Sequence, residues 1–170
     1  MKNRFENYDF WPSDNETPEI SWFKPQINKI KLTKSVPSEV NHYLQVHDIQ
    51  LWVNNENVAD LSHNATIQVS SVYISGVTDS SANNVIDGVV PTLTVTGNKG
   101  QFYTNSGTNE FIIITLANAY DVSVIQSLVM YNRDDRIYRI IDGHPRANMP
   151  DSEIQDLMDR LIGYEIQLLD

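Results

Sequence analysis

The chain contains no cysteine, so disulfide bonds cannot hold the fold together and thiol chemistry is excluded. It also lacks the run of about 18 apolar residues that a membrane-spanning helix requires. Its first residues, Met1 to Phe5, lead into acidic, Trp-rich sequence and not into the apolar core of a signal peptide. We therefore expect neither a membrane span nor a secretion signal.

Basic residues are scarce. The chain has 12 Lys and Arg against 22 Asp and Glu, which gives a formal net charge of −10. A surface that binds nucleic acid needs Lys and Arg to displace the counterions of the phosphate backbone. Nucleic acid is therefore excluded as the expected partner.

No motif for catalysis is present either. The chain has no Gly-x-Ser-x-Gly turn to carry a nucleophile and no Gly-rich loop to hold phosphates. His42 and His47 are five residues apart in an expected strand, which places them on opposite faces and prevents them from sharing a metal. His63 and His144 fall in expected loops. We therefore expect a protein that is not an enzyme.

The residues that are present suit one domain with an arm before it. A length of 170 residues with 41% hydrophobic residues is sufficient for a single buried core. Residues 1–26 are acidic and aromatic and contain Pro12, Pro18 and Pro25, which interrupt regular structure. We expect this arm to pack along the domain formed by residues 27–170, or along a partner.

Within residues 27–170, several segments alternate between apolar and polar side chains with the period of a strand, and Phe111 to Leu116 is a continuous apolar run short enough for a buried strand. The expected strands begin at Ile27 and cover Tyr43 to Val53, Thr66 to Val69, Pro91 to Thr96, Phe111 to Leu116, Val122 to Tyr131, and Tyr164 to Leu169. Phe111 to Leu116 and Val122 to Tyr131 are expected side by side at the centre of a sandwich. One short helix is expected at about 151–162, because its apolar residues fall on one helical face. Many short strands with one inserted helix predict an all-β sandwich or jelly roll.

Several phrases of the sequence follow the order found in one known family. They are Asn57-Val58-Ala59 with Ala65-Thr66 and Ser70-Ser71, then Asn83 to Gly88, Phe102 to Thr104, Phe111 to Leu116, Val124 to Asp135, and Arg160 to Ile166. This succession resembles the discoidin-like and F-type lectin family, which includes the coagulation-factor C-type domains. The resemblance implies a galactose-binding-like jelly roll over most of residues 27–170.

The sequence departs from this family in two places. The phrase from Tyr43 to Leu51 is similar to the family's last strands but stands first here, which indicates a circular permutation. Because jelly-roll termini lie close together, such a permutation preserves the strand pairing. Residues 136–159, which include most of the expected helix, form an insertion relative to the family and would overhang the loop end where its members bind ligands.

The resemblance implies a structural calcium site, because F-type lectins hold this ion through carboxylates and backbone oxygens. The matching positions give carboxylates from Asp48 and Asp87 and backbone oxygens from Asn84 and Val89. The family's serine ligand falls near Gly100, which has no hydroxyl. Asp87-Gly88 is alternatively an ordinary turn in which the Asp side chain caps its own backbone.

The resemblance also implies a sugar site. Arg133 and Arg160 stand at the family's arginine positions, with Asp135 between them and Tyr103 at the histidine position. The guanidinium fork of an arginine can hold two neighbouring hydroxyl groups. The family's cysteine pair is replaced here, which argues against fucose as the ligand. The alternative is that Arg133, Asp135 and Arg160 form a structural ion-pair network.

Two functions follow from the resemblance. The first is a carbohydrate- or glycan-binding domain that recognises its ligand through its loop end. The second is a structural or protein-docking jelly roll that has lost the sugar site. Permuted, cysteine-free domains in proteins of large DNA viruses look similar, which implies a place in the virus particle for this second function.

Overall fold

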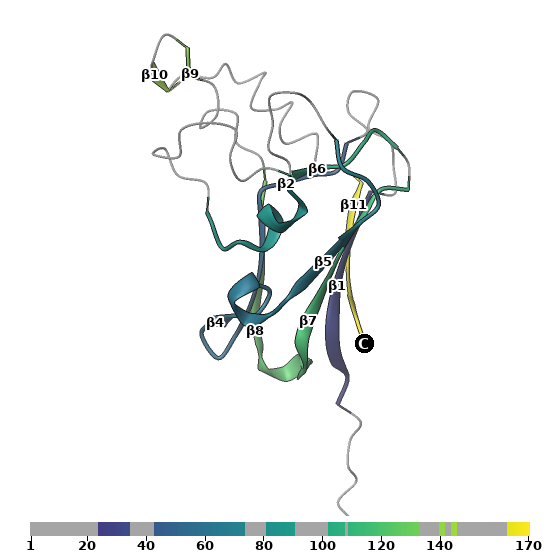
Figure 1. Ribbon diagram of the computed structural model, residues 1–170. Coiled ribbons are helices and arrows are strands. Elements are labelled where there is room, and N and C mark those ends of the chain that lie inside the picture. Colours follow the sequence, from purple (N-terminus) through teal and green to yellow (C-terminus); the bar gives the residue numbers. More distant parts are fainter. Residues whose placement is uncertain are drawn as a thin grey trace, which may run out of the picture.

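The computed structural model describes residues 24–34, 43–73, 81–90, 102–107, 109–132 and 163–170, and the backbone of residues 140–141 and 144–145. Figure 1 shows that strands dominate this part of the chain. The strands are β1 (Gln26–Lys34), β2 (Gln45–Val46), β3 (Asp48–Val53), β4 (Glu56–Asn57), β5 (Thr66–Val69), β6 (Phe102–Tyr103), β7 (Phe111–Asp121), β8 (Ile125–Tyr131), β9 (Ile140–Ile141), β10 (His144–Pro145) and β11 (Tyr164–Leu169). Three short 3-10 helices accompany them: η1 (Leu61–His63), η2 (Ala82–Ile86) and η3 (Val122–Val124). The prediction of an all-β fold is confirmed.

The largest sheet has four strands in the order β11-β1-β7-β5, all antiparallel to their neighbours. Alternation along β1 places Ile30 and Leu32 on one face, where each is 1% exposed. Their partners on β7 are Ile114 and Ile112, which are fully buried. This face of the sheet is therefore one wall of the hydrophobic core.

The second wall is a three-stranded sheet in the order β4-β3-β8. Ile49 and Leu51 of β3 belong to the same core cluster as Ile30 and Ile112 of the four-stranded sheet. Opposite Leu51 lies Leu128 of β8, which packs against that cluster. The core therefore lies between two antiparallel sheets, as in a β-sandwich.

The prediction that the strands at Phe111–Leu116 and Val122–Tyr131 lie side by side is wrong. β7 and β8 follow each other in sequence, but β7 pairs with β1 and β5, whereas β8 pairs with β3 in the other sheet. The reason is η3, where the Asp121 side chain accepts a hydrogen bond of 2.8 Å from the Ser123 backbone N–H and turns the chain. The expected strand from Val122 therefore begins only at Ile125.

The expected long strand from Tyr43 to Val53 is also divided. It breaks at His47 into β2, which pairs with β6, and β3, which pairs with β4 and β8. The bend at His47 allows consecutive residues of the chain to pair in two different sheets. The histidines expected in loops lie in short elements, since His63 ends η1 and the backbone of His144 is in β10.

Several predictions concern residues outside the described ranges. These are the arm over residues 1–23, the strand from Pro91 to Thr96, and the helix at 151–162. In the ranges that the structure describes, no helix is long and apolar enough to cross a membrane.

Candidate functional site

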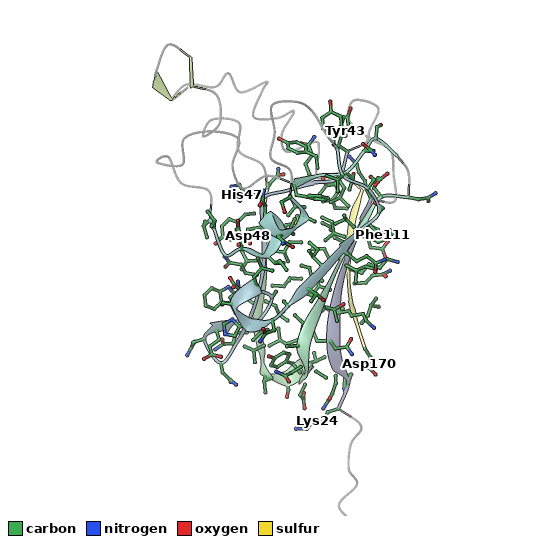
Figure 2. The ribbon with its side chains drawn as sticks, in the orientation of Figure 1. Lys24, Tyr43, His47, Asp48, Phe111 and Asp170 are labelled. Atoms are coloured by element: carbon green, nitrogen blue, oxygen red, sulfur yellow. The ribbon has the colours of Figure 1, made fainter. Side chains whose placement is uncertain are left out.

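Asp48 is an ionisable residue in the interior, where its side chain is fully buried. It is the first residue of β3. β4 pairs only with Trp52 and Val53, so it does not reach this end of β3, and η2 contacts the strand instead. Figure 2 shows Asp48 beside this short helix. The Asp48 side chain is therefore buried because η2 covers this end of β3.

A chain of hydrogen bonds runs along β3 from Asp48. Asp48, Gln50 and Trp52 are two residues apart and therefore point to the same side of the strand. The Trp52 indole N–H donates to Gln50 Oε1 at 3.0 Å, and Gln50 Nε2 donates to Asp48 Oδ2 at 2.7 Å. The other oxygen, Asp48 Oδ1, is buried and has no hydrogen-bond partner among the described residues. A buried oxygen with no protein partner is rare, and a bound ion or a water molecule is a way to satisfy it.

Two further carboxylates act on Asp48, those of Asp60 and Asp87. Asp60 caps η1, and its Oδ1 accepts a hydrogen bond of 2.7 Å from the Ser62 N–H. Asp87 Oδ1 accepts one of 2.9 Å from the Val89 N–H. Each of the three aspartates thus has one oxygen held by a donor from its own segment. The acids come together from β3, η1 and the end of η2.

Gly88 permits the close approach of Asp60 to the segment that carries Asp87. Its φ of 71° lies in the left-handed region, which a residue with a side chain adopts at a cost. A Cβ atom at this position would lie 2.5 Å from Asp60 Oδ2, which is too close for any real contact. The backbone N–H of Gly88 is also turned toward Asp48, where its hydrogen bond lowers the pKa of the carboxyl group. The Asp87-Gly88 pair therefore shapes the space between Asp48 and Asp60.

The electrostatics of the aspartate cluster, formed by Asp48, Asp60 and Asp87, favour an added positive charge. Burial raises the pKa of Asp48 to about 6, against the lowering effect of the Gln50 hydrogen bond, and the charges of Asp87 and Asp60 raise it further. Burial also raises the pKa of Asp87, with a further contribution from Asp60. At neutral pH Asp48 is therefore ionised in a place that disfavours its charge. A bound cation would remove this penalty.

The predicted calcium residues are partly brought together. Asp48 and Asp87 lie in the same cluster, and Asn84 lies in η2, half-buried. Val89 is 43% exposed, and its N–H donates to Asp87 Oδ1, so the Asp87 side chain caps the backbone as the turn alternative predicted. Among the residues that the structure describes, no group of three or more His, Cys, Asp or Glu side chains is placed to hold a metal ion. Calcium remains a prediction.

Asp60 was missed by the sequence-based interpretation. Its only local signal is the Asp-x-Ser pattern of Asp60 and Ser62, which predicts a helix cap. That pattern does not indicate that the cap lies near Asp48, because their approach depends on how the folded chain brings distant segments together.

A second group of residues lies at the end of the sandwich where β2 and β6 pair. The Tyr43 and Tyr73 rings meet edge to face, with centroids 5.3 Å apart, and the Tyr73 and Tyr103 rings are 6.5 Å apart. The Tyr73 N–H also donates to the Tyr103 carbonyl at 2.9 Å. Tyr103, the predicted sugar contact, is only 8% exposed, whereas Tyr73 is 36% exposed. Tyr73 is therefore the member of this tyrosine cluster that offers most ring surface to a ligand.

Hydrogen bonds hold the loops around the tyrosine cluster. The Ser71 hydroxyl donates to Glu110 Oε2 at 2.6 Å and accepts from the Asn105 N–H at 2.9 Å. Ser70 also donates to Glu110 and accepts from the Phe111 N–H at 2.9 Å. These bonds join the segment after β5 to the segments before β7. Tyr73 is thus presented by a fixed backbone.

The remaining sugar-site predictions, Arg133, Asp135 and Arg160, lie outside the described residues.

No protein-family model matches the chain, and no match was found among curated proteins or solved structures. The discoidin-like resemblance and the circular permutation remain predictions.

Proposed function

We propose that this chain is a non-catalytic binding domain that recognises a glycan at the end of the sandwich where β2 and β6 lie. The observation that carries the proposal is the tyrosine cluster, whose member Tyr73 is exposed while Tyr103 is buried beneath it. Ligand sites combine aromatic surface with a few placed polar groups, and a sugar offers matching C–H faces and hydroxyls.

Polar contacts to the sugar would come from residues that the resemblance selects. Arg133 and Arg160 can each donate to neighbouring hydroxyl groups, because the guanidinium fork has several donors in one plane. Asp135 would hold the two arginines in place or accept from a hydroxyl. In this arrangement Tyr103 supports Tyr73 and contributes little contact of its own.

Calcium is the second part of the proposal, with Asp48 and Asp87 as the carboxylate ligands and Asp60 as a neighbouring negative charge. Backbone oxygens of Asn84 and Val89 would complete the set, since calcium prefers six to eight oxygen ligands. The site fits such an ion because Asp48 Oδ1 is buried without a partner and Gly88 leaves room beside Asp60 Oδ2. When bound, the ion would neutralise the clustered charge and fasten η1 and η2 to β3.

A glycan array, probed with and without calcium, tests the glycan part. We expect Tyr73→Ala to abolish binding and Tyr73→Phe to retain it, because the ring supplies the contact. Arg133→Ala and Arg160→Ala should each weaken binding by about tenfold or more, which corresponds to losing one or two hydrogen bonds to a charged group.

Val124→Ala is the matched control, since Val124 is 39% exposed and lies on η3 at the opposite end of the sandwich. It should bind like the unmodified chain. If no glycan on the array binds the unmodified chain, the glycan proposal is wrong.

Thermal unfolding in calcium or in chelator tests the metal part. A ligand that binds only the folded state raises the midpoint, so calcium should stabilise the unmodified chain. Asp48→Asn should abolish this shift and Asp60→Asn should reduce it.

Asp121→Asn is the control for Asp60→Asn, because both aspartates cap a 3-10 helix through a serine N–H two residues later. It should change stability without changing the calcium shift. A midpoint that is the same in calcium and chelator would remove calcium from the proposal.

A further inference from the structure

β11 is an edge strand with an unusual surface. In the described part of the chain it has β1 on one side and no strand on the other. Ile166 and Leu168 point to the same side of the sheet as their partners Leu32 and Ile30 on β1. The β1 residues are 1% exposed, whereas Ile166 is 40% and Leu168 is 39% exposed. The core-facing side of the sheet therefore continues past β1 as an open apolar strip.

The edge of β11 also lacks the features that prevent strands from pairing between molecules. Natural edge strands are blocked by lysine, proline, a bulge or a very short length. β11 has six residues in continuous register with β1, no lysine or proline, and one charged residue, Glu165. The opposite edge of the same sheet, β5, has only four residues, and its Thr66 and Gln68 are exposed and polar. The two edges thus differ in their capacity to accept another strand.

The sequence of β11 is complementary to itself in one antiparallel register. If Ile166 faces Ile166 of a second copy, Tyr164 faces Leu168 on the apolar side and Glu165 faces Gln167 on the polar side. Moving the centre to Glu165 would place two like charges opposite each other, which is destabilising. Moving it to Gln167 would place Asp170 opposite Tyr164 and Glu165 opposite Leu169. Of these three registers, the one centred on Ile166 pairs apolar with apolar and polar with polar residues over Tyr164–Leu168 and sets no like charges opposite each other.

We infer that this face is an interface with a second copy of the chain, in which two β11 strands pair antiparallel about a two-fold axis at Ile166. The contact is isologous, because each copy contributes the same strand. It extends the four-stranded sheet continuously into that of the second copy and covers Ile166 and Leu168 of both. This inference does not depend on the proposed glycan or calcium sites.

Because the natural chain has no cysteine, single cysteine substitutions can test the register. In the proposed dimer the two residues at position 166 face each other with Cα atoms about 5 Å apart, within the range of a disulfide. Ile166→Cys should therefore form a covalent dimer on mild oxidation. Leu168→Cys is the matched control, since its exposure and face are the same but the two copies would be about 13 Å apart along the strands. It should remain largely uncrosslinked.

The dimer itself is measured by light scattering after size-exclusion chromatography, over a series of protein concentrations. The unmodified chain should be a dimer that dissociates on dilution. Ile166→Lys should be a monomer, and Gln68→Lys on the β5 edge should remain a dimer. Circular dichroism confirms that both lysine variants are folded.

Three results would overturn the inference. A chain that is monomeric at every concentration has no such interface. A dimer that persists in folded Ile166→Lys uses another surface. Equal crosslinking of Ile166→Cys and Leu168→Cys would show random collision and contradict the register.

Discussion

β3 and β11 are both six-residue strands with alternating side chains, yet the burial of their polar and apolar residues differs. β3 buries its polar residues, so that Asp48 is fully buried and Gln50 is 5% exposed. β11 leaves the apolar Ile166 and Leu168 about two-fifths exposed. The contrast shows that burial follows what covers a strand, and not the polarity of its residues alone.

The difference in covering has a structural origin. β3 pairs with β8 and with β4, and η2 also contacts it. β11 has a partner only in β1 within the described residues. Each strand therefore carries residues that its surroundings do not suit: an uncompensated charge in β3 and an uncovered apolar strip in β11. The candidate cation site and the candidate interface arise from these two mismatches.

The largest expected effect concerns the packing of β3. Leu51→Ala should lower the free energy of unfolding by about 2–5 kcal/mol, because the fully buried side chain leaves a cavity between the sheets. Urea unfolding followed by circular dichroism measures the change. A loss below about 1 kcal/mol would show that β3 is not packed as tightly as its burial indicates.

The next effect concerns the segment that covers Asp48. Gly88→Ala should lower the free energy of unfolding by about 1–3 kcal/mol, because the backbone at this position is left-handed, which is costly for a residue with a Cβ, and because the new Cβ would meet Asp60 Oδ2. The same variant should weaken calcium stabilisation, since it fills space beside the carboxylates. Gly107→Ala is a suitable comparison, because its Cβ would also meet a carboxylate oxygen, Glu110 Oε1 at 2.8 Å, but its backbone is not left-handed. Similar losses in the two variants would contradict the special role of Gly88.

The third effect concerns the buried charge itself. The pKa of Asp48 is about 6 in the folded chain and 3.8 ordinarily, so the folded state holds more protons between these values. The stability of the unmodified chain should therefore fall as the pH rises from about 4 to about 6 through this group, and the cost persists above pH 6. Asp48→Asn removes the charge, and at neutral pH in chelator it should raise the free energy of unfolding by about 1–2 kcal/mol after solvent screening is allowed for.

The measurement is the difference between the two proteins across this pH range. It isolates Asp48, because both retain buried His47, whose pKa is lowered mainly by desolvation and which acts in the opposite direction. His47 makes the folded state less stable as the pH falls through the histidine range. If the difference between the proteins does not change with pH, Asp48 is not the titrating group.

The smallest effect is expected in β11. Leu168→Ala should change the free energy of unfolding of the isolated monomer by less than about 1 kcal/mol, because 39% of the residue is already exposed to water. The comparison with Leu51→Ala uses the same substitution at a covered and an uncovered position. Urea unfolding at a concentration where the protein is monomeric measures it. Equal losses at the two positions would remove the contrast on which the interface proposal rests.

Much of the secondary structure could be predicted, because alternation is a local property of the extended chain. Thr66–Val69 and Tyr164–Leu169 form strands with the predicted bounds, and the strand at Phe111 extends further, to Asp121. The pairing of β8 with β3 could not be predicted, since the turn at η3 moves the chain to another sheet. Neighbouring strands in sequence are often neighbours in a sheet, and this pair is an exception.

The candidate sites were predictable to different degrees. The resemblance pointed to Asp48 and Asp87, and these two carboxylates do interact. Asp60 could not be found, because its cap pattern does not show that the folded chain brings Asp60 near Asp48 of the preceding strand β3. Tyr73 was missed because an isolated tyrosine in a loop has no motif, and its role emerges only from its contacts with Tyr43 and Tyr103.

The sequence by itself determined that no disulfide supports this protein, where several strands begin and end, and which residues of each strand share a face. These properties depend on residue type and on the two-residue period of a strand. Only the tertiary structure decided which faces are covered. That outcome placed the Asp48 carboxylate in the interior and left Ile166 and Leu168 open, because covering depends on segments that are distant in sequence.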